Sequence, residues 1–220
     1  MGRRLPIALL AAVILVAGCG GTSSSGEERK SARQILLDAE KAADAAQGVH
    51  IAGWIVDSGK RVDLRLDLAR TGGRGTMAQG NARADVERVG DVAYMRANSQ
   101  FWTAFANAQA AVLLHDKWLS GDARKKPFSA FASFLSLGSL INSAFDNYST
   151  LRKAGVRTYK GRRVIAIRDT RSEETLLVAA TSKPYPVAAI GKGRIEFSGW
   201  DTPVSVKAPK GAVDISAFGG

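Results

Sequence analysis

The chain has 220 residues, of which 31 are Lys or Arg and 20 are Asp or Glu, so its formal net charge is +11. This length fits one domain with a short extension, and it is enough to bury a substantial core. With 23 Gly, 6 Pro and 45% hydrophobic residues, the composition excludes a collagen-like or wholly disordered chain. One Cys and two His exclude a disulfide scaffold and a thiolate or His-rich metal site. We expect neither a metal nor a cofactor.

The N-terminus predicts a secreted, lipid-anchored protein. Arg3 and Arg4 precede an apolar run over residues 5–18, which is too short to cross a bilayer core of about 30 Å and fits a signal peptide. Small residues then lead into Cys19, as in a bacterial lipobox. We expect residues 1–18 to be a lipoprotein signal peptide, and Cys19 to be lipidated and to hold the protein on the extracytoplasmic face of the cell membrane. The alternative is an ordinary signal peptide followed by a chance cysteine.

The segment after Cys19 separates this anchor from the folded part. It is rich in Gly and Ser and then in charged residues, a composition that does not pack. We therefore expect residues 19–30 to be the lipidated cysteine and a flexible tether, and residues 31–220 to be one folded domain. Ser31 and Gln34 have the spacing of a capping box. Apolar residues follow at helical spacing, which predicts a helix over 32–47.

Beyond this helix the hydrophobic period changes to two. Every second residue from 62 to 68 is Val or Leu, and the residues between them are Asp or Arg, which predicts a strand with one buried and one wet face. Weaker strand patterns lie at 49–57, 73–79, 82–89 and 91–97, and a second group lies within 149–207. The short links between them indicate antiparallel meanders. The pattern predicts an α+β domain with a strongly curved antiparallel sheet of roughly ten strands.

Two stretches between the strand groups, 97–114 and 128–145, contain no charged residue. Both have helical apolar spacing, yet neither has the charged outer stripe of a surface helix. The second has too many Ser and Asn residues to span a membrane. Two interpretations remain open from the pattern alone: the helices are central core elements, or they line an apolar cavity on the concave face of the sheet.

Several short motifs, in order, resemble the LppX/LprG-type lipoproteins of actinobacteria, which belong to the wider LolA-like group. They are Gly90–Met95, Phe101-Trp102, Asp116–Leu119 and Phe197–Val204, with Ala208-Pro209 after them. This resemblance implies a half-barrel sheet with helices on its concave face and a hydrophobic cavity that holds acyl chains. It also implies a role in carrying lipids or lipoproteins within the cell envelope, with no catalytic residues.

The remaining chemistry-bearing residues do not indicate an enzyme. His50 and His115 stand alone, and the chain contains no G-x-S-x-G nucleophile elbow and no Walker spacing. Basic clusters occur at 124–126, 152–153 and 160–163. Outside the membrane anionic headgroups are a better match for these clusters than nucleic acid, but a solvated basic face that keeps the protein soluble is the favoured explanation.

The sequence thus predicts a non-catalytic envelope lipoprotein that binds the acyl chains of a lipid or lipoglycan and carries or presents it. The alternative is a protein-interaction or sensor lipoprotein on the same scaffold, with an envelope protein as its partner and no lipid cargo. For the first strand the face stays open, because Trp54 and Val56 share one side and Ile51 and Ile55 share the other. The candidate ligand-binding residues are Trp54, Val56, Leu64, Leu66, Met77, Tyr94, Trp102, Phe105, Trp118, Phe131, Phe134, Leu137, Leu140 and Ile141.

Overall fold

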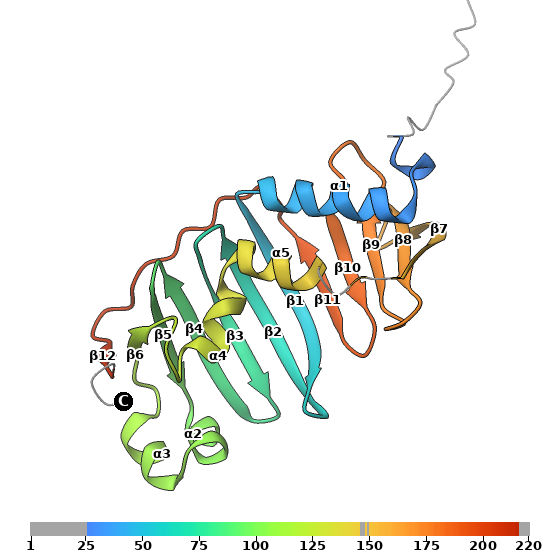
Figure 1. Ribbon diagram of the computed structural model, residues 1–220. Helices are drawn as coiled ribbons and strands as arrows, with labels where there is room; N and C mark the ends of the chain where they lie inside the picture. The colour runs from blue at the N-terminus through green and yellow to red at the C-terminus, as the bar shows by residue number, and fades with distance from the viewer. Residues whose placement is uncertain (1–25, 146–147, 149, 216–220) are drawn as a thin grey trace, which may run out of the picture.

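The computed structural model describes residues 26–145, 148 and 150–215. The predicted signal peptide, Cys19 and the first part of the predicted tether lie outside these residues. The described chain forms one sheet of twelve strands in the order β12-β6-β5-β4-β3-β2-β1-β11-β10-β9-β8-β7 (Figure 1). The strands are β1 (Gly48–Asp57), β2 (Lys60–Ala69), β3 (Gly72–Gln79), β4 (Ala82–Val89), β5 (Val92–Ala97), β6 (Leu119–Asp122), β7 (Leu151–Tyr159), β8 (Arg162–Asp169), β9 (Thr175–Ala179), β10 (Pro186–Ile190), β11 (Arg194–Ser198) and β12 (Val213–Asp214).

Two antiparallel meanders make up this sheet, one from β1 to β6 and one from β7 to β11. They join through β1 and β11, where Ile51 pairs with Phe197, and β12 adds to β6 in parallel. Ten of the strands correspond to the two predicted groups. The other two, β6 and β12, have only 4 and 2 residues, which is too short for a period-two pattern to stand out in the sequence.

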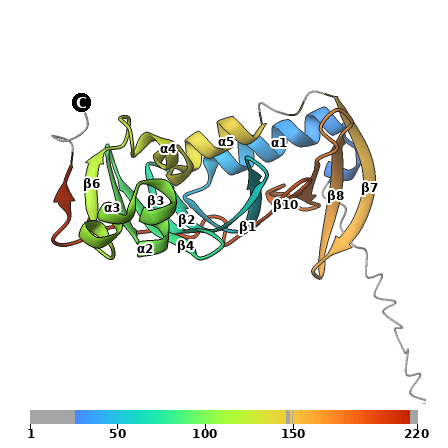
Figure 2. The ribbon, with the colours of Figure 1, turned by 90° about the horizontal axis from the view of Figure 1, so that it is seen from below.

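The sheet curves strongly without closing, and the helices α1, α4 and α5 lie on its concave face (Figure 2). Register shifts between Lys153 and Val156 in β7 and between Pro186 and Ala188 in β10 contribute to the bending. The predicted α+β half-barrel with helices over the concave face is therefore confirmed. The helical segments are η1 (Glu27–Arg29), α1 (Ala32–Ala45), α2 (Ser99–Phe105), α3 (Ala108–Leu114), α4 (Ser129–Ala132), η2 (Ser133–Leu135) and α5 (Leu137–Phe145).

Helix α1 starts as its sequence predicts and brings the chain across the upper edge of the sheet. The Ser31 hydroxyl accepts a hydrogen bond from the Gln34 amide at 3.2 Å, which satisfies one of the free donors of the first turn. Ordered structure begins before this cap, because Glu27–Arg29 form a 3₁₀ turn in which Glu27 is buried. Residues 26–30, which the composition assigned to the tether, therefore belong to the folded part.

Each of the two uncharged stretches forms short helices rather than one long helix. In the first stretch, Asn98 caps α2 by accepting from the Phe101 amide at 3.0 Å, and Asn107 caps α3 by accepting from the Ala110 amide at 2.8 Å. A second N-cap inside the stretch forces a break, because an N-cap residue is not itself helical. In the second stretch α4 continues directly into η2, and Ser136, whose backbone is extended, separates them from α5.

The core lies between the sheet and the helices of the second stretch. Phe128 is 2% exposed, and its ring rests on Gly121 of β6, where a Cβ atom would lie 2.4 Å from the ring. Leu135 and Leu137 are buried beside it. The central-core interpretation therefore holds for this part of the helical cover.

Candidate functional site

The two faces of the sheet differ sharply in chemistry because β2 alternates as its sequence predicts. Leu64, Leu66 and Leu68 are buried on the concave face. The residues between them are charged and point to the convex face, where Asp67 pairs with His50. The concave face is thus apolar, and the convex face carries ionised side chains.

The upper part of the concave face is filled by the helices. Leu137 and Ile141 of α5 are only 2% and 4% exposed, and Phe131 of α4 is also buried. Leu140 is half-buried and packs against the same cluster. These four predicted residues therefore form one hydrophobic core with Leu66.

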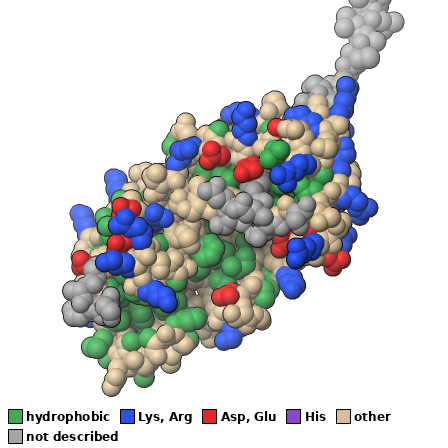
Figure 3. Space-filling view, viewed as in Figure 1, with side chains coloured by type: hydrophobic (Ala, Val, Ile, Leu, Met, Phe, Trp, Pro, Cys, Tyr) green, Lys and Arg blue, Asp and Glu red, His purple; other side chains and the backbone are tan. Residues whose placement is uncertain are grey.

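The lower part of the concave face is more open. Register and alternation place Ile55, Val62, Met77 and Ile195 around Leu64 on this face, and all but Leu64 are only half-buried. We call these five residues the apolar trough. Figure 3 shows hydrophobic side chains at the floor of a hollow below α5.

Two glycines help to keep this trough free of side chains. Gly53 of β1 lies opposite Leu64 and Gly75 of β3 lies opposite Leu66, so both fall on the concave face. A Cβ atom on Gly53 would lie 2.0 Å from the Arg194 carbonyl oxygen. Gly53 is therefore required for the close approach of β1 and β11 at this point.

Trp102 of α2 provides an unusual polar atom in this otherwise apolar region. Its residue is 8% exposed and belongs to the main hydrophobic cluster, but its buried indole Nε1–H has no hydrogen-bond partner among the described residues. Buried donors nearly always have an acceptor. This donor is therefore left for an acceptor that the described residues do not supply.

Four of the predicted wall residues lie on the opposite face. Trp54 and Val56 share the convex face because they pair across β2 with Asp63 and Arg61, and the Arg61 guanidinium lies 4.9 Å from the Trp54 ring centroid. Ile51 and Ile55 are the residues of that strand on the concave face, which resolves the open alternative. Tyr94 pairs with Glu87 on the convex face.

Trp118 is the fourth of these residues, and the guanidinium of Arg96 lies 5.0 Å from its ring centroid. The prediction took the aromatic rings of Trp54, Tyr94 and Trp118 as apolar wall residues. Strand alternation and cation–π contacts instead place these rings among charged side chains. Phe105 and Phe134 were also predicted to line the wall, but they are 57% and 40% exposed. Phe105 is the last residue of α2 and Phe134 is the middle residue of η2, and neither side chain is buried in the core.

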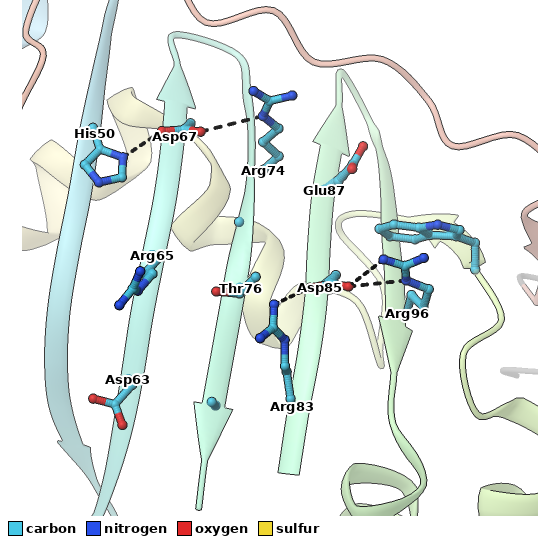
Figure 4. Close-up of a pocket in the computed structure, with 13 residues that line it drawn as sticks. His50, Asp63, Arg65, Asp67, Arg74, Thr76, Arg83, Asp85, Glu87 and Arg96 are labelled. Carbon is cyan, nitrogen blue, oxygen red and sulfur yellow. Dashed lines mark hydrogen bonds and ion pairs between the residues drawn. The ribbon is translucent and has the colours of Figure 1, made fainter. Parts of the chain in front are cut away.

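A charged groove that the sequence did not predict runs across the convex face of β1 to β5 (Figure 4). Its volume is about 750 Å³. The side chains come from alternate positions of neighbouring strands, so that acids and bases face one another across the sheet. The lining residues are His50, Asp63, Arg65, Asp67, Arg74, Gly75, Thr76, Ala78, Arg83, Asp85, Glu87, Arg96 and Trp118.

Most ionised groups in this groove neutralise one another. Arg96 binds Asp85 at 2.8 Å, while burial raises the pKa of the Glu87 carboxyl above its ordinary value. Arg65 differs, because its strand neighbours across the sheet are Ala52 and Thr76. Within the described part of the chain its guanidinium has no ion-pair partner. The small neighbours leave space above Arg65, and this is the hollow part of the groove.

His50, Asp67 and Ser198 lie in a row on this face, on three adjacent strands. The His50 Nδ1 atom is 2.7 Å from Asp67 Oδ1, but the described structure contains no hydrogen bond from the Ser198 hydroxyl to the His50 ring. The His50 side chain is 47% exposed. A nucleophilic triad needs the hydroxyl on the base and donors for an oxyanion, so this row is better explained as a surface ion pair beside a serine.

Two further observations limit the chemistry of the described residues. No three His, Cys, Asp or Glu side chains among residues 26–145, 148 and 150–215 converge as metal ligands. None of the helices in the same residues is both long enough and apolar enough to cross a bilayer.

No protein-family model and no curated protein matches the sequence. Among solved structures, the fold is similar to the crystal structure of LprF from Mycobacterium bovis, with a TM-score of 0.55 and 14% identity over 82% of this chain and 97% of that chain. The resemblance to LppX/LprG-type proteins is therefore confirmed at the level of the fold.

Two other structures are less similar. An uncharacterised conserved protein from Thermus thermophilus has a TM-score of 0.44 and 11% identity, covering 85% of this chain and 99% of that one. The MucA/MucB complex of Pseudomonas aeruginosa has a TM-score of 0.38 and 15% identity, with 79% and 58% covered.

Proposed function

We propose that this chain is a non-catalytic, membrane-anchored envelope lipoprotein. It binds the acyl chains of a lipid or lipoglycan on the concave face of its sheet and carries or presents that lipid. The observation that carries the proposal is the apolar trough, where Ile55, Val62, Met77 and Ile195 stay half-buried beside a packed core. Exposed apolar surface of this kind gains free energy when an acyl chain covers it.

The free indole N–H of Trp102 supports a ligand that combines acyl chains with a hydrogen-bond acceptor. An ester carbonyl at the head of an acyl chain has this combination. Such an acceptor would satisfy the buried donor, whose desolvation otherwise costs about 1–3 kcal/mol. The lipobox at Cys19 supports the location on the membrane, since two acyl chains there would form a stable anchor.

The test uses two neighbouring residues of β3 that point to opposite faces. Met77 lies in the trough and Ala78 lines the charged groove. The full chain is produced in the envelope of an actinobacterial host and examined by native mass spectrometry, followed by extraction into organic solvent. We expect the parent chain and Ala78→Trp to carry a reproducible extractable mass, and Met77→Trp to lose most of it because the ring occupies the trough.

A parent chain that is free of any bound mass under gentle conditions would overturn the proposal. Equal loss of the bound mass in both variants would also contradict the trough as its location. Circular dichroism of all three proteins establishes that the substitutions leave the fold intact, which is expected because neither residue is fully buried.

The charged groove favours a second candidate function, a partner-binding lipoprotein without lipid cargo. Arg65, which lines this groove and has no ion-pair partner among the described residues, is available to an acidic group of a protein partner. Crosslinking in the producing host compares Arg65→Glu with Arg157→Glu, an exposed arginine on β7. A crosslinked envelope protein that is lost only with Arg65→Glu, together with an empty trough, would favour this function over lipid carriage.

A further inference from the structure

The helical hairpin α2–α3 projects from the lower end of β4 and β5 (Figure 1). Helix α2 packs against β4, and β4 pairs with β3, which carries Met77 of the apolar trough. It exposes large hydrophobic side chains at its outer surface: Phe105 is 57% exposed, Val112 is 74% exposed and Leu113 is 63% exposed. These are the most exposed large hydrophobic residues in the described part of the chain. We call these three residues the apolar tip.

We propose that the apolar tip inserts into the outer surface of a lipid bilayer and docks the mouth of the trough against the membrane. This inference rests on the proposed function, because a lipid carrier must exchange its acyl chains with a membrane. The tip is the part of the surface whose composition suits that contact.

Three properties of the hairpin favour a bilayer over water as its environment. Residues 97–114 contain no charged side chain, so insertion removes no ion from water. The helix N-termini are capped within the hairpin by Asn98 and Asn107, so some of the free amide donors of each first turn are satisfied without water. Exposed aromatic and aliphatic side chains are typical of elements that lie about 5–10 Å deep at the headgroup boundary.

The surrounding charge favours an anionic bilayer over a protein surface. The chain as a whole has a net charge of +11, and basic groups near anionic headgroups are attracted to them. Lys117, three residues after α3, is exposed and has no ion-pair partner among the described residues. The one acid next to it, Asp116, faces His115 at 3.5 Å.

The position of the tip fits the proposed anchor at the other end of the domain. The 3₁₀ turn η1 lies beside β7 and β8, because Lys153 and Arg163 bind Glu28, whereas α2 and α3 lie at the opposite end of the sheet (Figure 1). The predicted tether at one end and insertion of the tip at the other would hold the trough, which lies between them, close to the bilayer. The trough and the tip thus meet the same membrane without a change of fold.

The test measures the depth of one side chain in the membrane. The full chain with Leu113→Cys, or with Val156→Cys on β7 as a control, is labelled with an environment-sensitive fluorophore. Val156 is also an exposed aliphatic residue, at 40%, but it lies on the far edge strand. Both proteins are reconstituted in vesicles of phosphatidylcholine and phosphatidylglycerol with or without brominated acyl chains. The unsubstituted chain undergoes the same labelling, so that any signal from Cys19 is subtracted.

We expect the emission of the probe at position 113 to shift to the blue and to be quenched by brominated chains, while the probe at 156 does neither. A probe at 113 that stays unquenched overturns the proposed insertion of the apolar tip, and so does equal quenching at both positions. Protection of position 113 by a copurifying protein instead of lipid also overturns it.

Native mass spectrometry of the same samples separates this inference from the proposed function. Quenching at 113 in a protein that carries no lipid supports the tip and contradicts lipid carriage. A bound lipid with an unquenched probe supports carriage and contradicts the tip. The substitution itself is safe for folding because the Leu113 side chain is 63% exposed, and Val112→Cys, at 74%, repeats the measurement one residue away.

Discussion

The guanidinium of Arg96 lies between the carboxylate of Asp85, at 2.8 Å, and the ring of Trp118, whose centroid is 5.0 Å away. All three side chains line the charged groove. Trp118, which lies in the sequence between α3 and β6, is thus held against the guanidinium of Arg96 on the convex face. Its role is to stack on Arg96, and it has no access to the concave apolar surface.

Replacing Trp118 by Leu tests that role because Leu keeps apolar bulk and removes the cation–π contact. We expect the free energy of unfolding, measured in urea, to fall by about 0.5–1 kcal/mol, with the bound lipid mass unchanged. A loss of bound lipid at unchanged free energy of unfolding would instead show that Trp118 contacts the acyl chains, as the sequence predicted.

Trp102→Phe removes an indole N–H that makes no hydrogen bond within the described chain. We expect no loss of stability from that atom, but weaker retention of the lipid by a factor of about 2–10, as for one hydrogen bond of about 0.5–1.5 kcal/mol. Trp200→Phe is the matched control, because Trp200 Nε1 donates to the Pro186 carbonyl oxygen at 2.8 Å.

This control should show the reverse pattern. Its stability should fall by about 1 kcal/mol, since an intramolecular hydrogen bond is lost, and its lipid retention should not change. The measurements are thermal unfolding and competitive displacement of a fluorescent fatty acid. If both variants behave alike, the Trp102 donor has no special relation to the ligand.

The sequence was sufficient to predict the strands of the sheet, but not which side chains of every strand point to the concave face. In β2 the strict alternation of Leu with charged residues placed Leu64 and Leu66 correctly on the apolar side. In β1 both faces carry large apolar residues, so Trp54 and Ile55 could not be distinguished until the pairing with β2 was known. The charged groove escaped prediction because its ionisable lining residues come from five neighbouring strands, and only the register brings them together.

The uncharged stretches illustrate a second limit. The lack of charged residues correctly indicated that neither stretch forms an ordinary surface helix with a charged outer stripe. It did not distinguish a buried helix from an exposed apolar one. The 128–145 stretch supplies the buried side chains of Phe128 and Leu137, whereas 97–114 exposes Val112 and Leu113. The two have similar composition, and the difference depends on which of them lies over the sheet.

Leu137 provides a direct measure of how tightly the upper concave face is packed. It is 2% exposed within the main hydrophobic cluster. Leu137→Ala should therefore lower the free energy of unfolding by about 2–5 kcal/mol, from lost burial and the cavity that remains. Leu140→Ala, at a half-buried neighbour, should cost clearly less. A small effect at Leu137 would mean that the space beneath α5 is loosely filled and continuous with the trough.

Glu196 of β11 connects two distant parts of the second meander on the convex face. Its Oε1 atom accepts from the Tyr159 hydroxyl at 2.8 Å and its other oxygen accepts from Lys160. The Lys160 ammonium is the main reason that the pKa of the Glu196 carboxyl is lowered from its ordinary value of 4.5. The unfolded chain therefore binds this proton more readily than the folded one, and the stabilisation is present above about pH 4.5 and is lost as the pH falls below it.

Glu196→Gln removes the titrating group, so its stability should fall less steeply with acid than that of the parent chain. We expect the difference between the two free energies of unfolding, measured in urea, to be largest at neutral pH and to shrink as the pH falls through and below 4.5. Lys160→Gln should reduce the same pH dependence, because it removes the main cause of the lowered pKa. A difference between parent and Glu196→Gln that stays constant with pH would show that the ion pair contributes nothing to holding the turn between β7 and β8 against β11.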